Sequence, residues 1–263
     1  MVKDDWLTYN EDMITAYHRP QTLDEALTLL SRPNTFPLGG GTLLSHPSTD
    51  SVQVVDLQAL GLNQIKKSGN NLEIGATVTL QQLLEDENCP DALRPALKLE
   101  APINIRNAAT IAGTIVACDG RSTFVTALVA LDSKLTVDGG PKTENGPRST
   151  VYGLGDFLPL RPRGLITSIN IPLQTRFAFQ YVSRTPADKP IVCVALAQWP
   201  SGRARLAVGG HGKAPMLAMD GTESEGVEIA ARNAFHEATD EWASAEYRAD
   251  AAATLAKRCL GKQ

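Results

Sequence analysis

The sequence predicts an α+β protein, in which helices and strands are mixed near the N-terminus and form separate blocks later in the chain. Residues 22–57 combine a capped helix with apolar runs that end in turn residues, which is typical of a small β-α-β unit. From Leu165 onward, β-rich runs follow one another closely, which indicates an antiparallel sheet. After Gly221 the chain becomes rich in Ala and Glu, which indicates helices. With 263 residues, 43% of them hydrophobic, it can bury a large core in one or two domains.

The first segment begins with a capping box, Thr22-Leu23-Asp24-Glu25. The apolar residues that follow fall on one helical face, and the helix is expected to end near Arg32-Pro33. A short apolar approach, Phe36-Pro37-Leu38, then leads into three glycines, and the run from Val52 to Leu57 predicts a buried strand.

The middle of the chain continues with the alternating run from Asn71 to Ala76, which predicts a strand. A second capping box, Thr79-Leu80-Gln81-Gln82, precedes a helix through Leu84, and another short helix is expected from about Asp91 to Leu99. An apolar helix through Leu131 and a strand from Lys134 to Asp138 complete this part.

Four β-rich runs and two helices are expected in the last hundred residues. The β-rich runs are Ile166–Ile171, Phe177–Ser183, Ile191–Trp199 and Arg203–Val208, and Ser201-Gly202 is the expected hairpin turn between the last two. We assign these runs to one antiparallel sheet. The helices are expected at about Val227–Ala238 and Ala245–Leu260.

Two runs of small residues indicate places where the backbone lies close to a neighbouring segment or a ligand. The first is Pro37-Leu38-Gly39-Gly40-Gly41-Thr42-Leu43-Leu44, and the second is Thr110-Ile111-Ala112-Gly113-Thr114. Glycine tolerates positive φ and has no Cβ to hold a ligand away. Successive backbone N–H groups in such a turn can form an anion site, so phosphate is the first ligand class to consider. The alternative is that both runs serve only backbone geometry and packing.

Composition argues against several classes of function. The formal charge of −4 gives no electrostatic footprint for nucleic acid or an anionic membrane surface. The charged N-terminus, Met1–Trp6, lacks the apolar core of a secretory signal, and no apolar run is long enough to span a membrane, so we expect a cytoplasmic protein. The cysteines show neither zinc nor iron–sulfur spacing, and no metal site is predicted. They are Cys89, Cys118, Cys193 and Cys259.

Several further motifs, taken together with the glycine turn, resemble a known family. They are Tyr17-His18-Arg19-Pro20, Gly39-Gly40-Gly41-Thr42, Ile74 to Thr79, Ile105 to Gly113, Ala130-Leu131-Asp132, Ser183-Arg184 with Asp188, and Tyr247-Arg248. In order and spacing they resemble the FAD-binding (medium) subunit of molybdenum hydroxylases, the family of the flavoprotein subunits of xanthine dehydrogenase and aerobic carbon monoxide dehydrogenase. The resemblance covers nearly the whole chain. The turn is not G-x-G-x-x-G, so a Rossmann domain is disfavoured.

The resemblance implies a particular domain organisation. Residues 1–157 would form an FAD-binding domain of the vanillyl-alcohol-oxidase (PCMH) type, with subdomains of about 1–57 and 58–157 and FAD between them. Residues 158–263 would form a C-terminal flavoprotein domain of antiparallel sheet and helices. The first glycine loop would receive the FAD pyrophosphate through its amides and the Thr42 hydroxyl, and the second loop would contact the cofactor from the other subdomain.

The chain departs from the family pattern in and after the second loop. The usual sequence resembles Thr-Ile-Gly-Gly-Asn followed by Ser-Pro-x-x-Asp, whereas this chain has Ala112, Thr114 and Thr123 at the positions of the first glycine, the asparagine and the aspartate. The nearby Asp119 is expected to replace the lost carboxylate, or to belong with Arg121 to a solvated loop. The predicted cofactor-binding residues are therefore Pro37, Leu38, Gly39, Gly40, Gly41, Thr42, Leu43, Leu44, Thr110, Ile111, Ala112, Gly113, Thr114, Asp119 and Thr123.

The function implied by the resemblance is electron transfer, with no catalytic side chain of its own because the flavin carries the redox chemistry. Molybdopterin would lie on a large partner subunit and [2Fe–2S] clusters on a small one, and FAD on this chain would pass electrons to NAD or another acceptor. Two alternatives remain open: a flavin-free or weakly flavin-binding scaffold subunit of the same complex, and a stand-alone flavin reductase.

Overall fold

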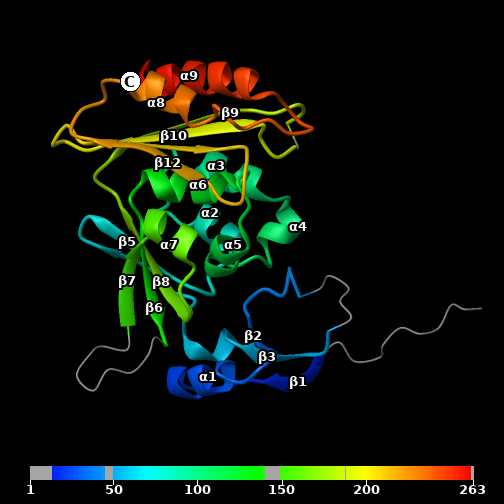
Figure 1. Cartoon of the computed structure of the whole chain (residues 1–263). Helices are drawn as coiled ribbons and strands as arrows, with labels where there is room; N and C mark the ends of the chain where they lie inside the picture. The colour runs from blue at the N-terminus through cyan, green and yellow to red at the C-terminus, as the bar shows by residue number, and fades with distance from the viewer. Residues whose placement is uncertain (1–13, 45–49, 140–148, 187, 262–263) are drawn as a thin grey trace, which may run out of the picture.

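The computed structural model describes residues 14–44, 50–139, 149–186 and 188–261, and the charged stretch Met1–Trp6 lies outside these ranges. Within them the chain forms three sheets, which Figure 1 shows stacked along the long direction of the molecule. A small lobe carries the N-terminal sheet, a five-stranded sheet with several helices follows, and a four-stranded sheet covered by two helices lies at the other end. The mixed helix and sheet content confirms the predicted α+β class.

The N-terminal lobe is a three-stranded parallel sheet of order β1-β3-β2, with β1 at Ile14–His18, β2 at Thr35–Leu38 and β3 at Val52–Asp56. Helix α1 (Leu23–Leu30) starts at Thr22, whose hydroxyl accepts from the Glu25 amide at 3.3 Å. The β-α-β unit is thus confirmed, with β1 as an additional strand. Since parallel strands end at one edge, the glycines after β2 lie beside the end of β3.

The core of this lobe is small and includes a residue from far along the chain. Buried Ala26 and Leu29 of α1 pack with Val55, Leu57 and Leu165. Leu165 is the first residue of β8, a strand of the neighbouring sheet, so the lobe is joined to the rest of the molecule through its core.

The five-stranded sheet has the order β4-β5-β8-β6-β7 and is antiparallel throughout. Its strands are β4 (Ile65–Ser68), β5 (Asn71–Gly75), β6 (Lys134–Asp138), β7 (Ser149–Gly153) and β8 (Leu165–Pro172), and a short 3₁₀ turn, η1 (Gln58–Leu60), precedes them. The helices of this part are α2 (Leu80–Glu85), α3 (Arg94–Glu100), α4 (Ile103–Arg106), α5 (Ile111–Ala117), α6 (Thr123–Ala130) and α7 (Leu154–Leu160). The predicted capping box at Thr79 is complete, with hydrogen bonds in both directions to Gln82.

Helix α6 is the central element of the fold. All eight of its residues are buried, and it packs against α3 on one side and against β10 and β11 of the next sheet on another. Because α6 is packed on several sides, its first residues are held in a fixed position relative to their neighbours.

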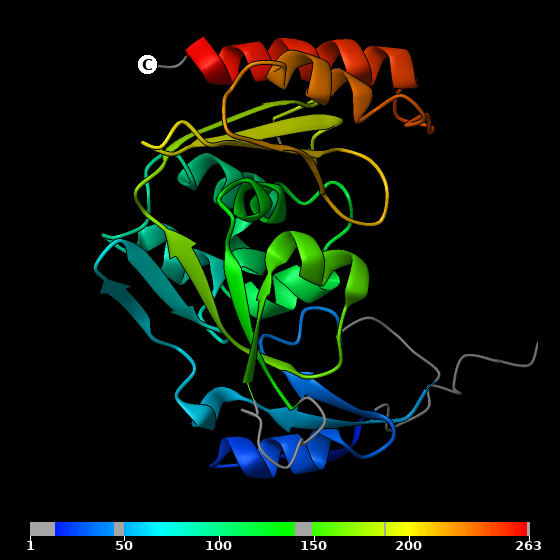
Figure 2. The same ribbon diagram turned by 60° about the vertical axis from the view of Figure 1, so that its left-hand side comes forward.

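The C-terminal sheet has the order β12-β11-β10-β9 and is antiparallel, as predicted for three of the four runs. Its strands are β9 (Arg176–Val182), β10 (Val192–Gln198), β11 (Ala204–Gly209) and β12 (Met216–Gly221). The predicted hairpin turn joins β10 to β11, with Gly202 at φ +93°. Helices α8 (Val227–Asn233) and α9 (Ala245–Gly261) lie across the outer face of this sheet, as Figure 2 shows.

Two expectations need correction. The run Ile166–Ile171, assigned to the C-terminal sheet, is β8 and pairs with β5 and β6. Its alternating burial identifies a strand but does not specify the partner, because partner choice depends on distant parts of the chain. The helix expected to reach Ala238 ends at Asn233, and single turns follow in which Phe235 is buried. The division of the chain after residue 157 stays a prediction. In the described ranges no helix has the length and apolar character that a membrane crossing needs.

Candidate cofactor site

The two glycine-containing loops, far apart in sequence, lie against each other. A Cβ added to Gly40 would lie 1.6 Å from the carbonyl oxygen of Ala108, and one added to Gly39 would lie 2.8 Å from Thr110 Oγ1. Gly41 has φ +69°, a conformation that favours glycine. All three glycines are therefore required by the backbone path that brings the first loop onto the second.

The second loop is the start of a helix. Thr110 is the N-cap of α5, and its hydroxyl accepts from the Gly113 amide at 3.1 Å. The Thr114 hydroxyl donates to the Thr110 carbonyl at 2.9 Å. On its other side the loop is tied to the segment before α2, because the Ile111 amide donates to the Val78 carbonyl at 2.8 Å. The first loop thus rests on a well-anchored surface.

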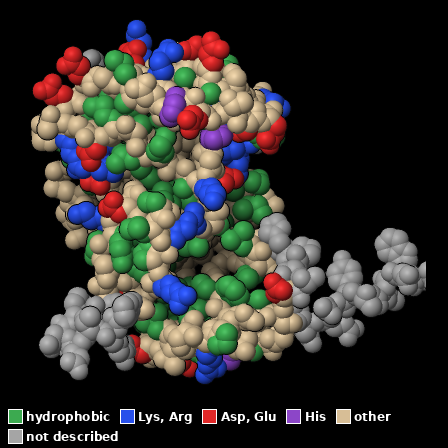
Figure 3. All heavy atoms as spheres, in the orientation of Figure 1, with side chains coloured by type: hydrophobic (Ala, Val, Ile, Leu, Met, Phe, Trp, Pro, Cys, Tyr) green, Lys and Arg blue, Asp and Glu red, His purple; other side chains and the backbone are tan. Residues whose placement is uncertain are grey.

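A cavity of about 510 Å³ opens beside these loops, between the small lobe and the body of the molecule. Figure 3 shows the surface hollowed there, with basic and hydrophobic side chains around the hollow. Four predicted residues line the cavity: Thr42, Leu43, Gly113 and Thr114. The other lining residues are Leu80, Lys98, Leu99, Glu100, Ala101, Pro102, Ile105, Ala109, Ala117, Cys118, Pro186 and Lys189.

The remaining predicted residues lie elsewhere. Gly39, Gly40 and Thr110 form the contact between the two loops, next to the cavity lining at Thr42 and Gly113. Ile111 is fully buried in the core, and Pro37 borders a separate hollow next to α1. The cavity lining does not include Leu38, Gly41, Leu44 or Ala112 either. The roles predicted for these residues toward a cofactor stay predictions.

The structure does not place the Thr123 hydroxyl in the cavity. Thr123 is 1% exposed, and its Oγ1 lies 2.7 Å from the Ala96 carbonyl oxygen and 3.2 Å from Glu100 Oε2. The predicted contact between Thr123 and the cofactor therefore has no support from the geometry, because the hydroxyl hydrogen is directed into the protein.

Asp119 and Arg121 are held in contacts of their own. Asp119 accepts from the Arg121 amide at 2.9 Å and pairs with Lys189 at 3.0 Å. The Arg121 guanidinium donates to the Pro190 carbonyl at 3.0 Å and lies over the Trp242 ring. Both side chains join the middle of the chain to the connection between β9 and β10, and neither lines the cavity.

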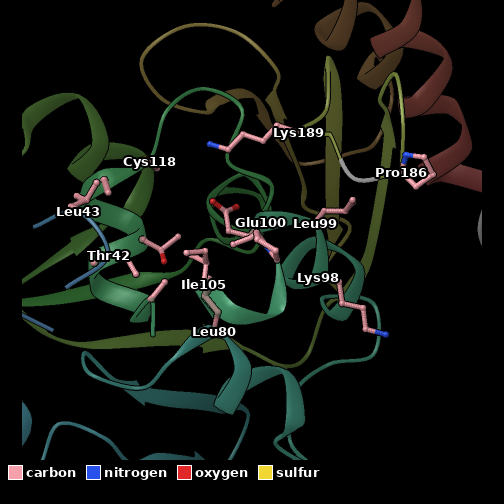
Figure 4. Close-up of a pocket in the computed structure, with 16 residues that line it drawn as sticks. Thr42, Leu43, Leu80, Lys98, Leu99, Glu100, Ile105, Cys118, Pro186 and Lys189 are labelled. Carbon is pink, nitrogen blue, oxygen red and sulfur yellow. The ribbon is translucent and has the colours of Figure 1, made fainter. Parts of the chain in front are cut away.

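Glu100 is the residue that sequence reasoning missed. It is the last residue of α3, and Figure 4 shows its carboxylate between Thr42 and Leu43 on one side of the view and Lys98, Leu99 and Pro186 on the other. One oxygen, Oε2, accepts from the Phe124 amide at 2.8 Å and the Ser122 hydroxyl at 2.9 Å. Burial raises the pKa of this carboxyl group, and the hydrogen bonds oppose that shift. No signal in the sequence links Glu100 to partners more than twenty residues away.

The chemistry of the lining suits a ligand with an anionic group and an apolar part. In the described ranges, the amides of Gly40 and Thr42 donate no hydrogen bond to another residue, so they are available to an anion at the edge of the cavity. Lys98 and Lys189 also line the cavity, and the Lys189 ammonium pairs with Asp119 at 3.0 Å. Leu43 and Ile105 expose 57% and 38% of their surface at the opening, which is typical of a binding surface for an apolar group. A flavin dinucleotide, with its diphosphate, hydroxyl-bearing chains and ring, fits this set of donors.

The residues around the cavity are not suited to metal binding or to thiol chemistry. Within the described part of the chain, no cluster of three or more His, Cys, Asp or Glu side chains could hold a metal ion. Cys118 lines the cavity, but burial raises its pKa to about 11, so the thiol stays protonated at neutral pH.

Comparisons with known proteins identify the family of the chain. The family model for the FAD binding domain in molybdopterin dehydrogenase matches residues 11–174. The chain is 29% identical over 246 residues to YgfM, an uncharacterised protein of Escherichia coli (strain K12), covering 90% of this chain and 91% of that one. It is 28% identical over 224 residues, 78% of each chain, to the glyceraldehyde dehydrogenase medium chain of Sulfolobus acidocaldarius.

A solved structure shows the same fold. A chain of the reconstituted CO dehydrogenase from Oligotropha carboxidovorans matches with a TM-score of 0.78 at 23% identity, covering 94% of this chain and 96% of that one. The predicted family is confirmed by the match of the family model to more than half of the sequence. The chain belongs to the FAD-binding family of the molybdopterin dehydrogenases and is an oxidoreductase flavoprotein subunit.

Proposed function

We propose that this chain is the electron-transfer subunit of a molybdenum-containing hydroxylase or dehydrogenase. In this proposal it takes electrons from [2Fe–2S] clusters of a small partner subunit and passes them to NAD or another acceptor, while a large partner subunit holds molybdopterin. The observation that carries the proposal is the contact between the two glycine loops beside a cavity with anion-binding and apolar walls, in a chain of this family.

The relatives and the residue chemistry support this division of labour. The Sulfolobus relative is named a medium chain, which implies a larger and a smaller chain beside it. This chain's cysteines are all buried and far apart in sequence, so they are not arranged to ligate iron–sulfur clusters. The clusters and the molybdenum cofactor are accordingly assigned to partners.

The residues of this chain would bind and orient the cofactor. When bound, FAD supplies the redox chemistry. The amides of Gly40 and Thr42 and the Thr42 hydroxyl would hold the diphosphate. Leu99 and Ile105, which also line the cavity, would cover part of the ring and exclude water from it. The rigid contact between the loops keeps these donors in place without a ligand, which lowers the entropy cost of binding.

The test is flavin binding and complex formation by the full chain. Purified protein reconstituted with FAD should show the flavin band at about 450 nm, and the apoprotein should lack it. Protein purified from cells that co-express its partners should carry iron, sulfide and molybdenum in addition to flavin. Failure to bind flavin under any condition would contradict the proposal. Partners recovered without flavin would instead support a scaffold role, and turnover of a small substrate with NAD(P)H by the isolated chain would support a stand-alone reductase.

A further inference from the structure

We propose that Glu100 accepts a hydrogen bond from a hydroxyl group of the ribityl chain of the bound flavin, and so positions the cofactor in the cavity. The inference rests on the proposed FAD-binding function and names a residue that the family resemblance does not assign. It begins from the place of the carboxylate in the cavity wall, facing the glycine loop across the opening (Figure 4).

The two oxygens of this carboxylate have different surroundings. Oε2 is within hydrogen-bond distance of three donors, the Phe124 amide at 2.8 Å, the Ser122 hydroxyl at 2.9 Å and the Thr123 hydroxyl at 3.2 Å. In the described ranges, Oε1 has no hydrogen-bond partner. A carboxylate can accept several hydrogen bonds, so Oε1 retains its full capacity for a ligand.

The carboxylate is fixed before a ligand arrives. Phe124 and Ser122 belong to the start of α6, whose residues are all buried, and this makes the anchor rigid. Backbone N–H groups at the start of a helix also favour a negative charge. An acceptor held in one orientation gives a stronger and more selective hydrogen bond than a mobile one.

The charge of Glu100 decides which part of the ligand it can face. A carboxylate repels a diphosphate, so the diphosphate belongs on the side of the glycine loop, where amides are available. A neutral hydroxyl group can donate to Oε1 without that penalty. Between a diphosphate and an isoalloxazine ring, a flavin nucleotide carries the hydroxyl groups of its ribityl chain, which matches the position of Glu100 between the glycine loop and the far wall.

Asp119 and Thr123, the two residues that the sequence suggested for this contact with the cofactor, are less suitable than Glu100. Asp119 is paired with Lys189 and does not line the cavity. Thr123, which stands at the position of the family's aspartate, is buried and lies against Glu100. The carboxylate of Glu100 is therefore close to the position at which this chain lacks that aspartate. In this chain a carboxylate from α3 therefore takes the place of one from the start of α6.

The experiment compares flavins that differ in the ribityl chain. Full-length wild type, Glu100→Gln and the control Glu85→Gln, an exposed carboxylate at the end of α2, would be titrated with FAD, riboflavin and lumiflavin, with flavin fluorescence as the readout. Lumiflavin has the ring but no ribityl chain. We expect Glu100→Gln to weaken FAD and riboflavin binding by about ten- to a hundredfold, which is the effect of one hydrogen bond to a charged group. Lumiflavin binding and the control should stay unchanged.

Several results would overturn the proposal. Equal binding of riboflavin by wild type and Glu100→Gln would overturn it alone, while leaving the FAD function intact. An equal loss for lumiflavin and riboflavin would overturn it too, because Glu100 would then act on the ring or on the fold. Absence of flavin binding by wild type would overturn this proposal and the proposed function together. Should Glu100→Gln not fold, Glu100→Asp keeps the charge but withdraws the carboxylate, and the same selective loss for riboflavin is expected.

Discussion

Arg121 lies over the ring of Trp242, with 4.6 Å between the guanidinium carbon and the ring centroid. Arg184 lies over the same ring at 4.8 Å. Trp242 precedes α9, Arg121 precedes α6, and Arg184 follows β9, so one indole joins three parts of the chain that are far apart in sequence.

We expect Trp242→Ala to lower the free energy of unfolding by about 1–2 kcal/mol, since each exposed cation–π contact contributes about 0.5–1 kcal/mol. Trp242→Phe keeps an aromatic face and should recover at least half of the loss. Urea unfolding followed by circular dichroism measures both variants. A Trp242→Ala protein as stable as wild type would show that the two contacts contribute nothing.

The close approach of Gly40 to Ala108 predicts a severe effect of one methyl group. Gly40→Ala places a Cβ 1.6 Å from a backbone oxygen, so the first loop must move away from the second. We expect a loss of stability of about 1–3 kcal/mol and loss of FAD binding. Gly155→Ala is the matched control, because its Cβ meets only Arg205 Nη2 at 3.8 Å. Normal FAD titration of Gly40→Ala would mean that the loops need not touch for binding.

Glu100 predicts a pH-dependent difference in the stability of the apoprotein. Burial raises its pKa in the folded state, so its charged form is disfavoured by folding. The contribution of Glu100 to the free energy of unfolding is therefore fully present below pH 4.5, the ordinary pKa of the group. It is lost as pH rises through the higher pKa that Glu100 has in the folded state. Glu100→Gln, which carries no charge, should therefore match wild type near pH 4.5 and become the more stable protein as pH rises toward neutrality.

The neighbouring groups do not obscure this comparison. The charge of Lys189 opposes the rise in the pKa of Glu100, as do the hydrogen bonds. Burial raises the pKa of Cys118 to about 11 and that of Cys193 to about 12, so both thiols stay protonated. Urea unfolding of both proteins at several pH values measures the difference. A Glu100→Gln variant that loses stability most at neutral pH would mean that the charged carboxylate stabilises the fold.

The four cysteines should be unreactive in the native chain. All four are buried, and burial raises the pKa of Cys89 and Cys118 to about 11. The thiolate is the nucleophile, so iodoacetamide at pH 7.5 should modify none of them until urea is added. Mass spectrometry of the intact chain counts the modified thiols. Rapid labelling of Cys118 alone would indicate that the cavity is more open to water than its lining suggests.

Local features were predictable because their causes are local. The capping residues Thr22 and Thr79 and the Ser201-Gly202 turn depend on residues within a few positions of one another, and the structure has each where the sequence predicts it. The family resemblance also identified the two loops as parts of one site, and the structure brings them into contact.

Long-range features were not predictable in the same way. The partners of β8 and the role of Glu100 depend on residues that approach only in the folded chain. Sequence distance suggested Asp119 as the substitute carboxylate, whereas the packing of α3 against α6 brings Glu100 to the start of α6 instead. A search along the sequence cannot find a residue whose relevance comes from helix packing.

The position of Leu165 in the core of the N-terminal lobe has a consequence for the order of folding during synthesis. The lobe closes its core with a residue more than a hundred positions downstream of its last strand, and that residue begins β8, the middle strand of the five-stranded sheet. A ribosome must therefore release β8 before either the lobe or this sheet can be completed. The cofactor cavity is lined by Thr42 and Leu43, which follow the second strand of the lobe, and by Pro186 and Lys189, which follow β8 in the chain, so it too is complete only after β8 has been released.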